Sequence, residues 1–318
     1  MPVKDSDHVL TIGSRGSKLA VIQAKMVETS LRRAFPGLVV SFKTVTTTGD
    51  RDRNRSLDVF GGQGVFVKEL EQALTSGEID LAVHSLKDVP TELGTGLKLS
   101  ATLPREDPRD VLVSRSGLKL ALLPMGSWVG TDSRRRAAQL KAVRPDVATR
   151  PIRGNIDTRL RKVRMGEVDG VILAAAALLR LGWPDRITEF LPVDSFLPAV
   201  GQGAVAVEIR SDDKMTDRIA SSVNDLPTWQ AVLAERAFMR TLGGGCRAPI
   251  AALATVADGY LTIDGMVASM DYATIVRDRN AGPAEQAEAI GAELARMALD
   301  GEGKRIVYES GGLNVSTG

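Results

Sequence analysis

The chain has 318 residues, 43% of them hydrophobic, and is long enough for two or three globular domains. Its single cysteine excludes an internal disulfide framework, and a net charge of +2 argues against a protein that binds polyanions over its whole surface. Residues 1–8 are polar with no signal-peptide core, and the longest apolar run, residues 171–179, is too short for a bilayer, so we expect a cytoplasmic protein.

The first hundred residues predict alternating strands and helices. A strand at residues 9–12 ends in a glycine-containing turn, and the long amphipathic helix after it is ended by Pro36-Gly37. The polar stretch 47–64 has no steady period and is long for a connector, which is typical of a functional lid. This part is completed by strands at 39–45 and 79–83 and a helix at 65–76.

A second block repeats this order of elements. Residues 128–131 match residues 12–14 as strand, glycine and hydroxyl, and residues 166–169 match residues 77–80 in front of a buried strand. Two matches in the same order predict two similar α/β lobes.

Two proline-containing segments join the predicted lobes, at residues 103–110 and 191–203. The apolar strand that follows the second segment, residues 204–209, is expected to return to the first lobe. Two crossings predict a hinge, with a ligand-binding cleft between the lobes.

The order of predicted elements changes after Pro227. A helix runs to Leu242, and three strands and a final helix follow. These elements predict an α+β domain with a three-stranded antiparallel sheet. The predicted fold class is therefore α/β, two hinged lobes plus this C-terminal domain. The expected domains are residues 1–103 with 204–224 (lobe 1), 104–203 (lobe 2) and 225–318.

The only cysteine, Cys246, follows three glycines and precedes Pro249. Glycine permits positive φ and close approach to a ligand, and proline fixes the direction in which the chain leaves. The thiol is therefore expected on a presented loop. The alternative is a small buried apolar side chain, a common state of a free cysteine.

Lys87 and Asp88 follow directly after the buried strand 79–83. Catalytic groups often lie where a strand ends at a cleft, and a carboxylate there stabilises a developing cation or relays a proton. The alternative is a plain surface turn before Pro90.

Arginines gather at the starts of predicted elements, close to hydroxyl and amide side chains at helix N-termini. Such N-termini favour anions, and the planar guanidinium matches a carboxylate or phosphate. The alternative is a solvated basic face, which better explains Arg161 and Arg164. The residues concerned are Arg15, Arg134, Arg135, Arg136, Arg150, Arg153 and Arg159, with Ser17, Ser133 and Asn155.

Other chemical classes find little support in the sequence. With only His8 and His84, a metal site built from Cys and His is not expected, and a Cys–His nucleophile would need His84. Gly61-Gly62-Gln63-Gly64 lacks the Lys-Ser/Thr of a phosphate-binding loop. An aromatic content of 4% and the small net charge argue against nucleic-acid binding.

Seven stretches in the same order resemble the porphobilinogen deaminase family over nearly the whole chain. They are residues 15–20, 64–71, 84–90, 131–139, 153–155 with Arg159, 197–204 and 244–246.

The resemblance implies two lobes like those of periplasmic binding proteins and a dipyrromethane cofactor joined to Cys246 by a thioether. It implies head-to-tail condensation of four porphobilinogen molecules with loss of ammonia, and release of hydroxymethylbilane for haem biosynthesis. It further implies a lid at residues 47–64 with Phe66 just beyond. We also expect a monomer without a metal ion. By the same match Asp88 is catalytic; Arg15, Ser17, Arg153 and Arg180 bind substrate; and Lys87, Ser133, Arg135, Arg136 and Arg159 bind the cofactor or the growing chain.

The sequence departs from the family pattern at three positions. Arg134 stands where the family usually has Leu, Gln63 replaces a common Lys in the lid, and Arg247 stands where Gln is frequent. These changes bear on lid function and local anion affinity rather than on Asp88 or Cys246. A two-lobed protein that binds or senses small anions is the alternative function, although it needs neither the cysteine loop nor a third domain.

Replacing the single thiol tests the expected attachment. Cys246→Ser removes the only cysteine, so we expect a folded protein with no covalent adduct and no activity. Intact mass spectrometry of wild type and variant measures the adduct directly. Normal turnover by the Cys246→Ser protein would contradict the interpretation.

Overall fold

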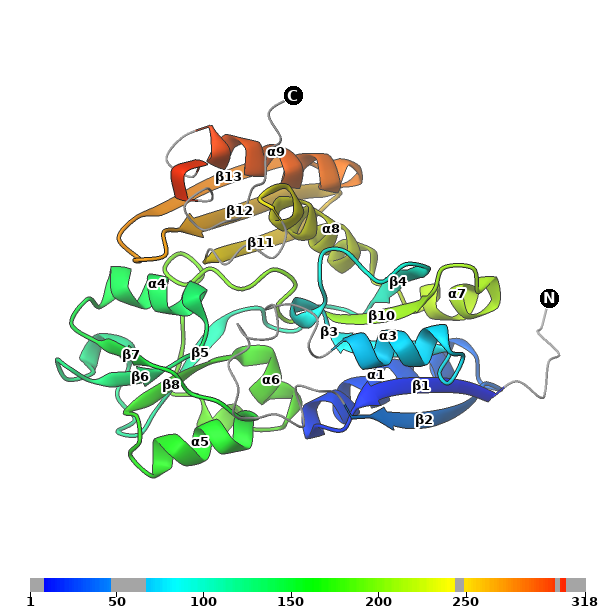
Figure 1. Ribbon diagram of the computed structural model, residues 1–318, viewed down its shortest axis with the longest axis horizontal. Coiled ribbons are helices and arrows are strands. Elements are labelled where there is room, and N and C mark those ends of the chain that lie inside the picture. Colours follow the sequence, from blue (N-terminus) through cyan, green and yellow to red (C-terminus); the bar gives the residue numbers. More distant parts are fainter. Residues whose placement is uncertain (1–8, 47–66, 244–248, 301–303, 307–318) are drawn as a thin grey trace. The chain divides into compact units, whose positions relative to one another are not determined.

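The computed structural model describes residues 9–46, 67–243, 249–300 and 304–306 (Figure 1). The chain divides into two compact units, Met1–Arg105 with Ala204–Trp229, and Glu106–Gly203 with Gln230–Gly318. It passes between them three times, so neither unit is one continuous segment. The three-domain boundaries expected from the sequence remain a proposal.

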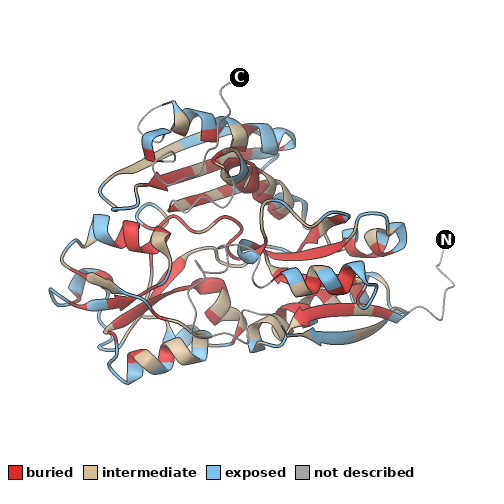
Figure 2. Cartoon of the chain, in the orientation of Figure 1, coloured by how far each residue is buried: buried red, intermediate tan, exposed pale blue. Residues whose placement is uncertain are grey.

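The first unit is built on a sheet whose strands are, in spatial order, β2 (Val39–Val45), β1 (Val9–Arg15), β3 (Leu81–Ser85), β10 (Val205–Arg210) and β4 (Leu97–Thr102). The first three are parallel, and β10 runs antiparallel to both of its neighbours. Apolar residues of α1 (Lys18–Ala34) and α7 (Lys214–Ser221) pack in one cluster with the sheet, and those of α3 (Lys68–Thr75) pack in another. The central strands are therefore buried (Figure 2).

The second unit contains a sheet with the same pattern of directions, in the order β7 (Ala148–Arg150), β6 (Trp128–Gly130), β8 (Gly170–Ala174), β5 (Asp110–Ser114) and β9 (Glu189–Phe190). β6 is parallel to β7 and β8, and β5 is antiparallel to β8 and β9. Helix α4 (Arg134–Val143) packs in one core cluster, and α5 (Ile156–Arg164) and α6 (Ala175–Arg180) in the other. The prediction of two similar α/β lobes is confirmed.

The three-stranded antiparallel sheet expected after the cysteine is present, in the order β11 (Ile250–Ala257), β12 (Tyr260–Ala268), β13 (Ile275–Pro283). Helices α8 (Leu226–Thr241) and α9 (Ala287–Leu299) pack with it in a single core, which includes Phe238, Ile263 and Leu294. The C-terminal part of the predicted fold class is confirmed.

Strands β4 and β5 were not predicted, although Leu97–Thr102 alternates apolar and polar residues and Asp110–Ser114 contains three consecutive aliphatic side chains. The strand expected at 79–83 begins two residues later, at Leu81. The amide of Ile79 still donates to the Ala73 carbonyl of α3, at 3.2 Å. Short 3-10 turns connect several elements: η2 (Leu86–Asp88), η3 (Leu120–Leu122), η4 (Pro184–Arg186) and η5 (Ala284–Gln286).

A tight crossing of α8 and α9 gives a test of this packing. A Cβ atom at Gly291 would lie 2.0 Å from the carbonyl oxygen of Ala234, so the helices must separate to accept it. We expect Gly291→Ala to lose about 1–3 kcal/mol to overpacking, which outweighs the helix-propensity gain of about 1 kcal/mol. Urea denaturation measures the change. Gly37→Ala is the control, since no atom lies within 4 Å of its Cβ position; equal midpoints for the two variants would contradict the packing.

Candidate active site

A polar pocket in the first unit brings together residues from the ends of β1 and β3. Arg15 ends β1, Ser17 begins α1, His84 and Ser85 end β3, and Asp88 lies in the turn η2 that follows. Three of these five residues, Arg15, Ser17 and Asp88, were predicted as site residues, and the pocket joins them although they come from two separate parts of the chain.

Capping and hydrogen bonding fix the wall of this pocket. The Ser17 hydroxyl accepts a hydrogen bond from the Ala20 amide at 3.3 Å, which caps α1. Gln23 on α1 exchanges hydrogen bonds with the Ser85 hydroxyl at 2.9 and 3.0 Å, and so ties the helix to β3. The N-terminus of α1, with its partial positive charge, therefore belongs to the pocket wall and favours an anionic ligand there.

Asp88 reaches the pocket because β3 ends in a single 3-10 turn. Leu86 and Val89 are buried and anchor the turn, whereas Lys87 and Asp88 between them are exposed. Among the residues that the structure describes, the Asp88 carboxylate has no hydrogen bond or ion pair, so it is available to a ligand. Asp88 thus lies in an exposed turn and also lines the pocket, and its catalytic role stays a prediction.

In the second unit, two helix N-termini carry several of the predicted anion-binding residues. Ser133 caps α4 by accepting from the Arg136 amide at 3.4 Å, and Asn155 caps α5 by accepting from the Thr158 amide at 3.0 Å. Arg159 donates from Nε to the Gly154 carbonyl at 2.9 Å. Gly154 has φ +108°, a conformation that favours glycine and lets this turn form in front of α5.

The guanidinium groups of Arg153 and Arg180 differ in the partners that they contact. Arg153 Nε lies 3.5 Å from an oxygen of Asp132 on the same lobe. Arg180 donates from Nη2 to the Gly203 carbonyl at 2.7 Å, but its Nε is buried without a hydrogen-bond partner. Burial lowers the pKa of the Arg180 guanidinium, an effect that Glu106 partly offsets. A buried N–H with no acceptor is costly, so this position suits an anionic ligand.

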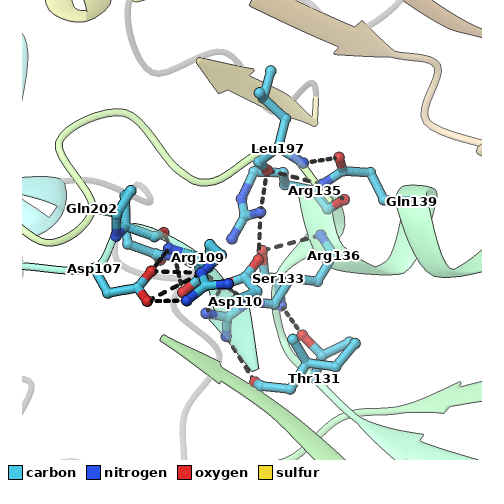
Figure 3. Close-up of polar contacts among 12 residues, drawn as sticks. Asp107, Arg109, Asp110, Thr131, Ser133, Arg135, Arg136, Gln139, Leu197 and Gln202 are labelled. Atoms are coloured by element: carbon cyan, nitrogen blue, oxygen red, sulfur yellow. Dashed lines mark hydrogen bonds and ion pairs between the residues drawn. The ribbon is translucent and has the colours of Figure 1, made fainter. Parts of the chain in front are cut away.

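Arg135 and Arg136 lie inside the lobe, where both contact Asp110 (Figure 3). Arg135 Nη1 donates to Asp110 Oδ2 at 2.7 Å and to the Leu197 carbonyl at 2.6 Å. Arg136 donates from Nη2 and Nε to Asp110 Oδ1, at 2.7 and 3.1 Å, and from Nη1 to the Ile172 carbonyl at 2.8 Å. The side chain of Arg136 is therefore committed to the interior of the protein.

Asp110 also binds the segment through which the chain leaves this lobe. Gln202 Nε2 donates to Asp110 Oδ1 at 2.9 Å and to the Pro108 carbonyl at 2.8 Å. Burial alone would raise the pKa of Asp110, but the guanidiniums of Arg135 and Arg136 outweigh it and hold that pKa well below its ordinary value. Asp110 is thus an ionised, fully buried carboxylate.

Several predicted residues lie outside the described part of the chain. These are Cys246 with its neighbour Arg247, the lid at residues 47–64 with Gln63, and Phe66. Arg134, the departure from the family pattern in α4, is described, and its Nη1 lies 3.8 Å from Met270 Sδ.

Two family models together match most of this chain. The porphobilinogen deaminase, dipyrromethane cofactor binding domain, matches residues 10–218, and the porphobilinogen deaminase C-terminal domain matches residues 229–300. The chain belongs to the porphobilinogen deaminase family. Porphobilinogen deaminase of Syntrophobacter fumaroxidans is 47% identical over 304 residues, covering 96% of this chain and 98% of that protein. Porphobilinogen deaminase of Syntrophotalea carbinolica is 48% identical over 302 residues, with 95% and 96% covered.

Solved structures outside the porphobilinogen deaminase family give a weaker likeness. The match to a Salmonella typhimurium periplasmic binding protein covers 68% of this chain and 91% of that protein, with a TM-score of 0.38 and 13% sequence identity. In the described ranges, no helix combines the length and apolar character needed to cross a membrane. The same ranges hold no cluster of three or more His, Cys, Asp or Glu side chains suited to a metal ion.

The described residues fit the dipyrromethane cofactor that this family's first domain model names. Pyrroles of this pathway carry acetate and propionate groups, so the cofactor and the chain built on it are anionic. The unpartnered Nε of Arg180 and the capped N-termini of α4 and α5 are suited to carboxylates. The donor set of the lobe therefore agrees with the chemistry of the cofactor.

Three polar residues of these sites were missed from the sequence: Asp110, Gln202 and Glu208. Glu208 is completely buried on β10 and contacts His84 of the pocket. The available signal was the isolated charge of Asp110 and Glu208 within apolar strands, at Asp110–Ser114 and Val205–Arg210. A charge in a buried strand requires a partner, but the sequence does not name that partner.

The Asp110 cluster makes stability depend on pH in a specific way. Because the folded-state pKa of Asp110 is depressed, its charge stabilises the fold above the unfolded pKa of about 3.9, and the contribution disappears as pH falls through the folded value. We expect Asp110→Asn to lose about 3–5 kcal/mol of unfolding free energy at pH 7, since it leaves two buried guanidiniums uncompensated. The difference from wild type should shrink as the pH drops below about 4.

Urea denaturation at several pH values measures this loss. Asp146→Asn is the matched control, because Asp146 pairs with Arg144 at the surface of the same lobe. A much smaller effect is expected for the control, and equal losses for the two variants would show that burial of Asp110 adds nothing.

Proposed function

We propose that this chain is a hydroxymethylbilane synthase. It joins four porphobilinogen molecules head to tail, releases one ammonia for each, and frees hydroxymethylbilane by hydrolysis in haem biosynthesis. The observation that carries the proposal is the pocket where Asp88, Arg15 and the N-terminus of α1 meet, in a chain that matches the porphobilinogen deaminase models over residues 10–218 and 229–300. The alternative of a small-anion binding or sensing protein does not account for the match to the C-terminal domain.

Asp88 is proposed as the catalytic group. Loss of ammonia from an aminomethylpyrrole is driven by the ring nitrogen, and positive charge develops on the pyrrole N–H. A fixed carboxylate stabilises that charge and accepts a hydrogen bond from the N–H. The Asp88 carboxylate has no competing partner among the described residues, and its turn is anchored by Leu86 and Val89.

The basic and hydroxyl residues are proposed to bind the acetate and propionate groups. Arg15 and Ser17 act in the pocket of the first unit, and Arg153 and Arg180 act on the second. A guanidinium fork makes paired hydrogen bonds to a carboxylate, so these residues orient the substrate rather than react with it.

Cys246 is proposed to hold the dipyrromethane through a thioether, with Lys87, Ser133, Arg135, Arg136 and Arg159 around it. When attached, the cofactor supplies the pyrrole chain to which the first porphobilinogen is joined. Since Arg136 is committed to Asp110 and to Ile172, we propose that it acts by fixing the N-terminus of α4, where Ser133 stands.

The enzyme is further proposed to be a cytoplasmic monomer that binds no nucleic acid. One cysteine in 318 residues suits a reducing compartment, and the net charge of +2 offers little attraction for a polyanion.

Asp88→Asn tests the catalytic assignment, because it keeps the size of the side chain and removes its charge. Loss of one preorganised electrostatic contact typically slows a reaction about 10²–10³-fold. Variant molecules that carry the cofactor are mixed with porphobilinogen, and the ladder of adduct masses is followed over time. We expect each rung to form 10²–10³-fold more slowly than in wild type.

Asp212→Asn is the control, since Asp212 is exposed in a turn of the same unit and lies outside the pocket. Its ladder should match that of wild type. A normal ladder in Asp88→Asn would transfer the chemistry to another group.

A further inference from the structure

A buried histidine–carboxylate pair, whose histidine lines the Asp88 pocket, has no part in the proposed function so far. His84 Nε2 lies 2.9 Å from Glu208 Oε2. The side chain of His84 is 4% exposed and that of Glu208 is 0% exposed. The antiparallel pairing of β3 with β10 places His84 opposite Ala206 and Glu208 opposite Ala82, so the two side chains lie on a diagonal of the same sheet face.

Glu208 is less satisfied than a structural carboxylate usually is. Its Oε1 is buried and has no hydrogen-bond partner, so among the described residues His84 alone bonds to this side chain. A buried carboxylate with one partner is costly, and replacing such a pair by apolar side chains is often neutral or stabilising. The pair is therefore a poor device for stability alone.

The hydrogen bond suits one tautomer of the histidine. When the Glu208 oxygen accepts, His84 donates from Nε2, and the lone pair of the neutral ring lies on Nδ1. The other charged groups that line the pocket with the histidine are Arg15 and Asp88. Helix α3, which carries Glu69, packs against β3 and β10.

We propose that Glu208 is a positioning residue that fixes His84 in the Nε2–H tautomer, and that His84 Nδ1 accepts the proton released at each porphobilinogen addition. This rests on the proposed function. When two pyrrole rings join, a carbon–carbon bond forms, ammonia leaves one ring's methylene carbon, and the other ring loses a C–H proton while its electron pair returns to the ring. The proton moves to Nδ1, Glu208 stabilises the imidazolium, and the proton then passes to the released ammonia to give ammonium.

This division of labour leaves Asp88 charged throughout the addition. If Asp88 took the proton itself, it would lose the charge that stabilises the pyrrole cation. With His84 as a second base, hydrogen-bonded to the buried Glu208, Asp88 keeps its charge. A carboxylate orients an imidazole base in the same way in hydrolases.

The tautomer is measured without reference to activity. The chain has two histidines, so His8→Gln leaves His84 as the only imidazole. Long-range ¹H–¹⁵N spectra of the cofactor-loaded His8→Gln protein at neutral pH are expected to show a protonated Nε2 and an unprotonated Nδ1. A protonated Nδ1 with a bare Nε2 would overturn the proposal.

Kinetics of two variants test the role of the pair. General-base catalysis typically contributes 10²–10⁴-fold, so His84→Gln should lower kcat at least 10²-fold, and Glu208→Gln at least tenfold, with KM changed less than about twofold. Only folded, cofactor-loaded molecules are compared, selected by intact mass and circular dichroism. Unchanged kcat in both variants would overturn the proposal.

Asp217→Asn is the matched control, since it removes a charge bonded to Lys98 in the same unit, outside the pocket. It should leave kcat unchanged. Failure of the proposed function would be seen separately, as a wild-type protein that carries no adduct or builds no mass ladder. The tautomer measurement does not depend on that result. If Glu208→Gln does not fold, the His8→Gln spectra and the kcat of His84→Gln still decide the outcome.

Discussion

The buried carboxylate of Asp110 is the constraint on which the second lobe depends. It is the first residue of β5, where the chain enters the lobe sheet, and it accepts hydrogen bonds from two arginines of α4. It also accepts one from Gln202, a single residue before the chain leaves the unit at Gly203. One carboxylate therefore binds the strand by which the chain enters the lobe, the segment by which it leaves, and helix α4. An unpaired charge in this interior would be expensive, so the members of the cluster depend on one another.

The three consecutive arginines of α4 show what local sequence alone does not reveal about such a cluster. Successive helix residues point about 100° apart, so three neighbours cannot share one face. Arg134 is half-buried near Met270, whereas Arg135 and Arg136 are buried against Asp110. The helix N-terminus suggested a ligand site for all three, but the partner that draws two of them inward lies 25 and 26 residues away.

Much of the fold was predictable because it is encoded locally. The capping residues Ser17, Ser133 and Asn155 stand where the sequence placed helix starts, and the repeated strand–glycine–hydroxyl order corresponds to two sheets of the same topology. Asp88 at the end of a buried strand was found for the same reason. By contrast, β4 and β5 follow proline-containing or polar stretches that suggested connectors, and the pairing of His84 with Glu208 joins residues 124 positions apart. Long-range pairs of this kind depend on topology, which no single window of the sequence contains.

The position of β10 in the sheet also determines when, during synthesis, the first sheet can be completed. This strand lies between β3 and β4 in the first sheet, yet the whole segment Glu106–Gly203 precedes it in the chain. On the ribosome, β3 and β4 therefore emerge with the gap between them unfilled, and they wait while the second lobe is synthesised. Closing so long a loop is entropically costly and slow, and contacts of high sequence separation form late in folding. The first segment to be translated thus belongs to a unit that is completed only after residues 106–203 have been made. Its strand edges stay exposed during that interval, and premature aggregation is most to be expected there.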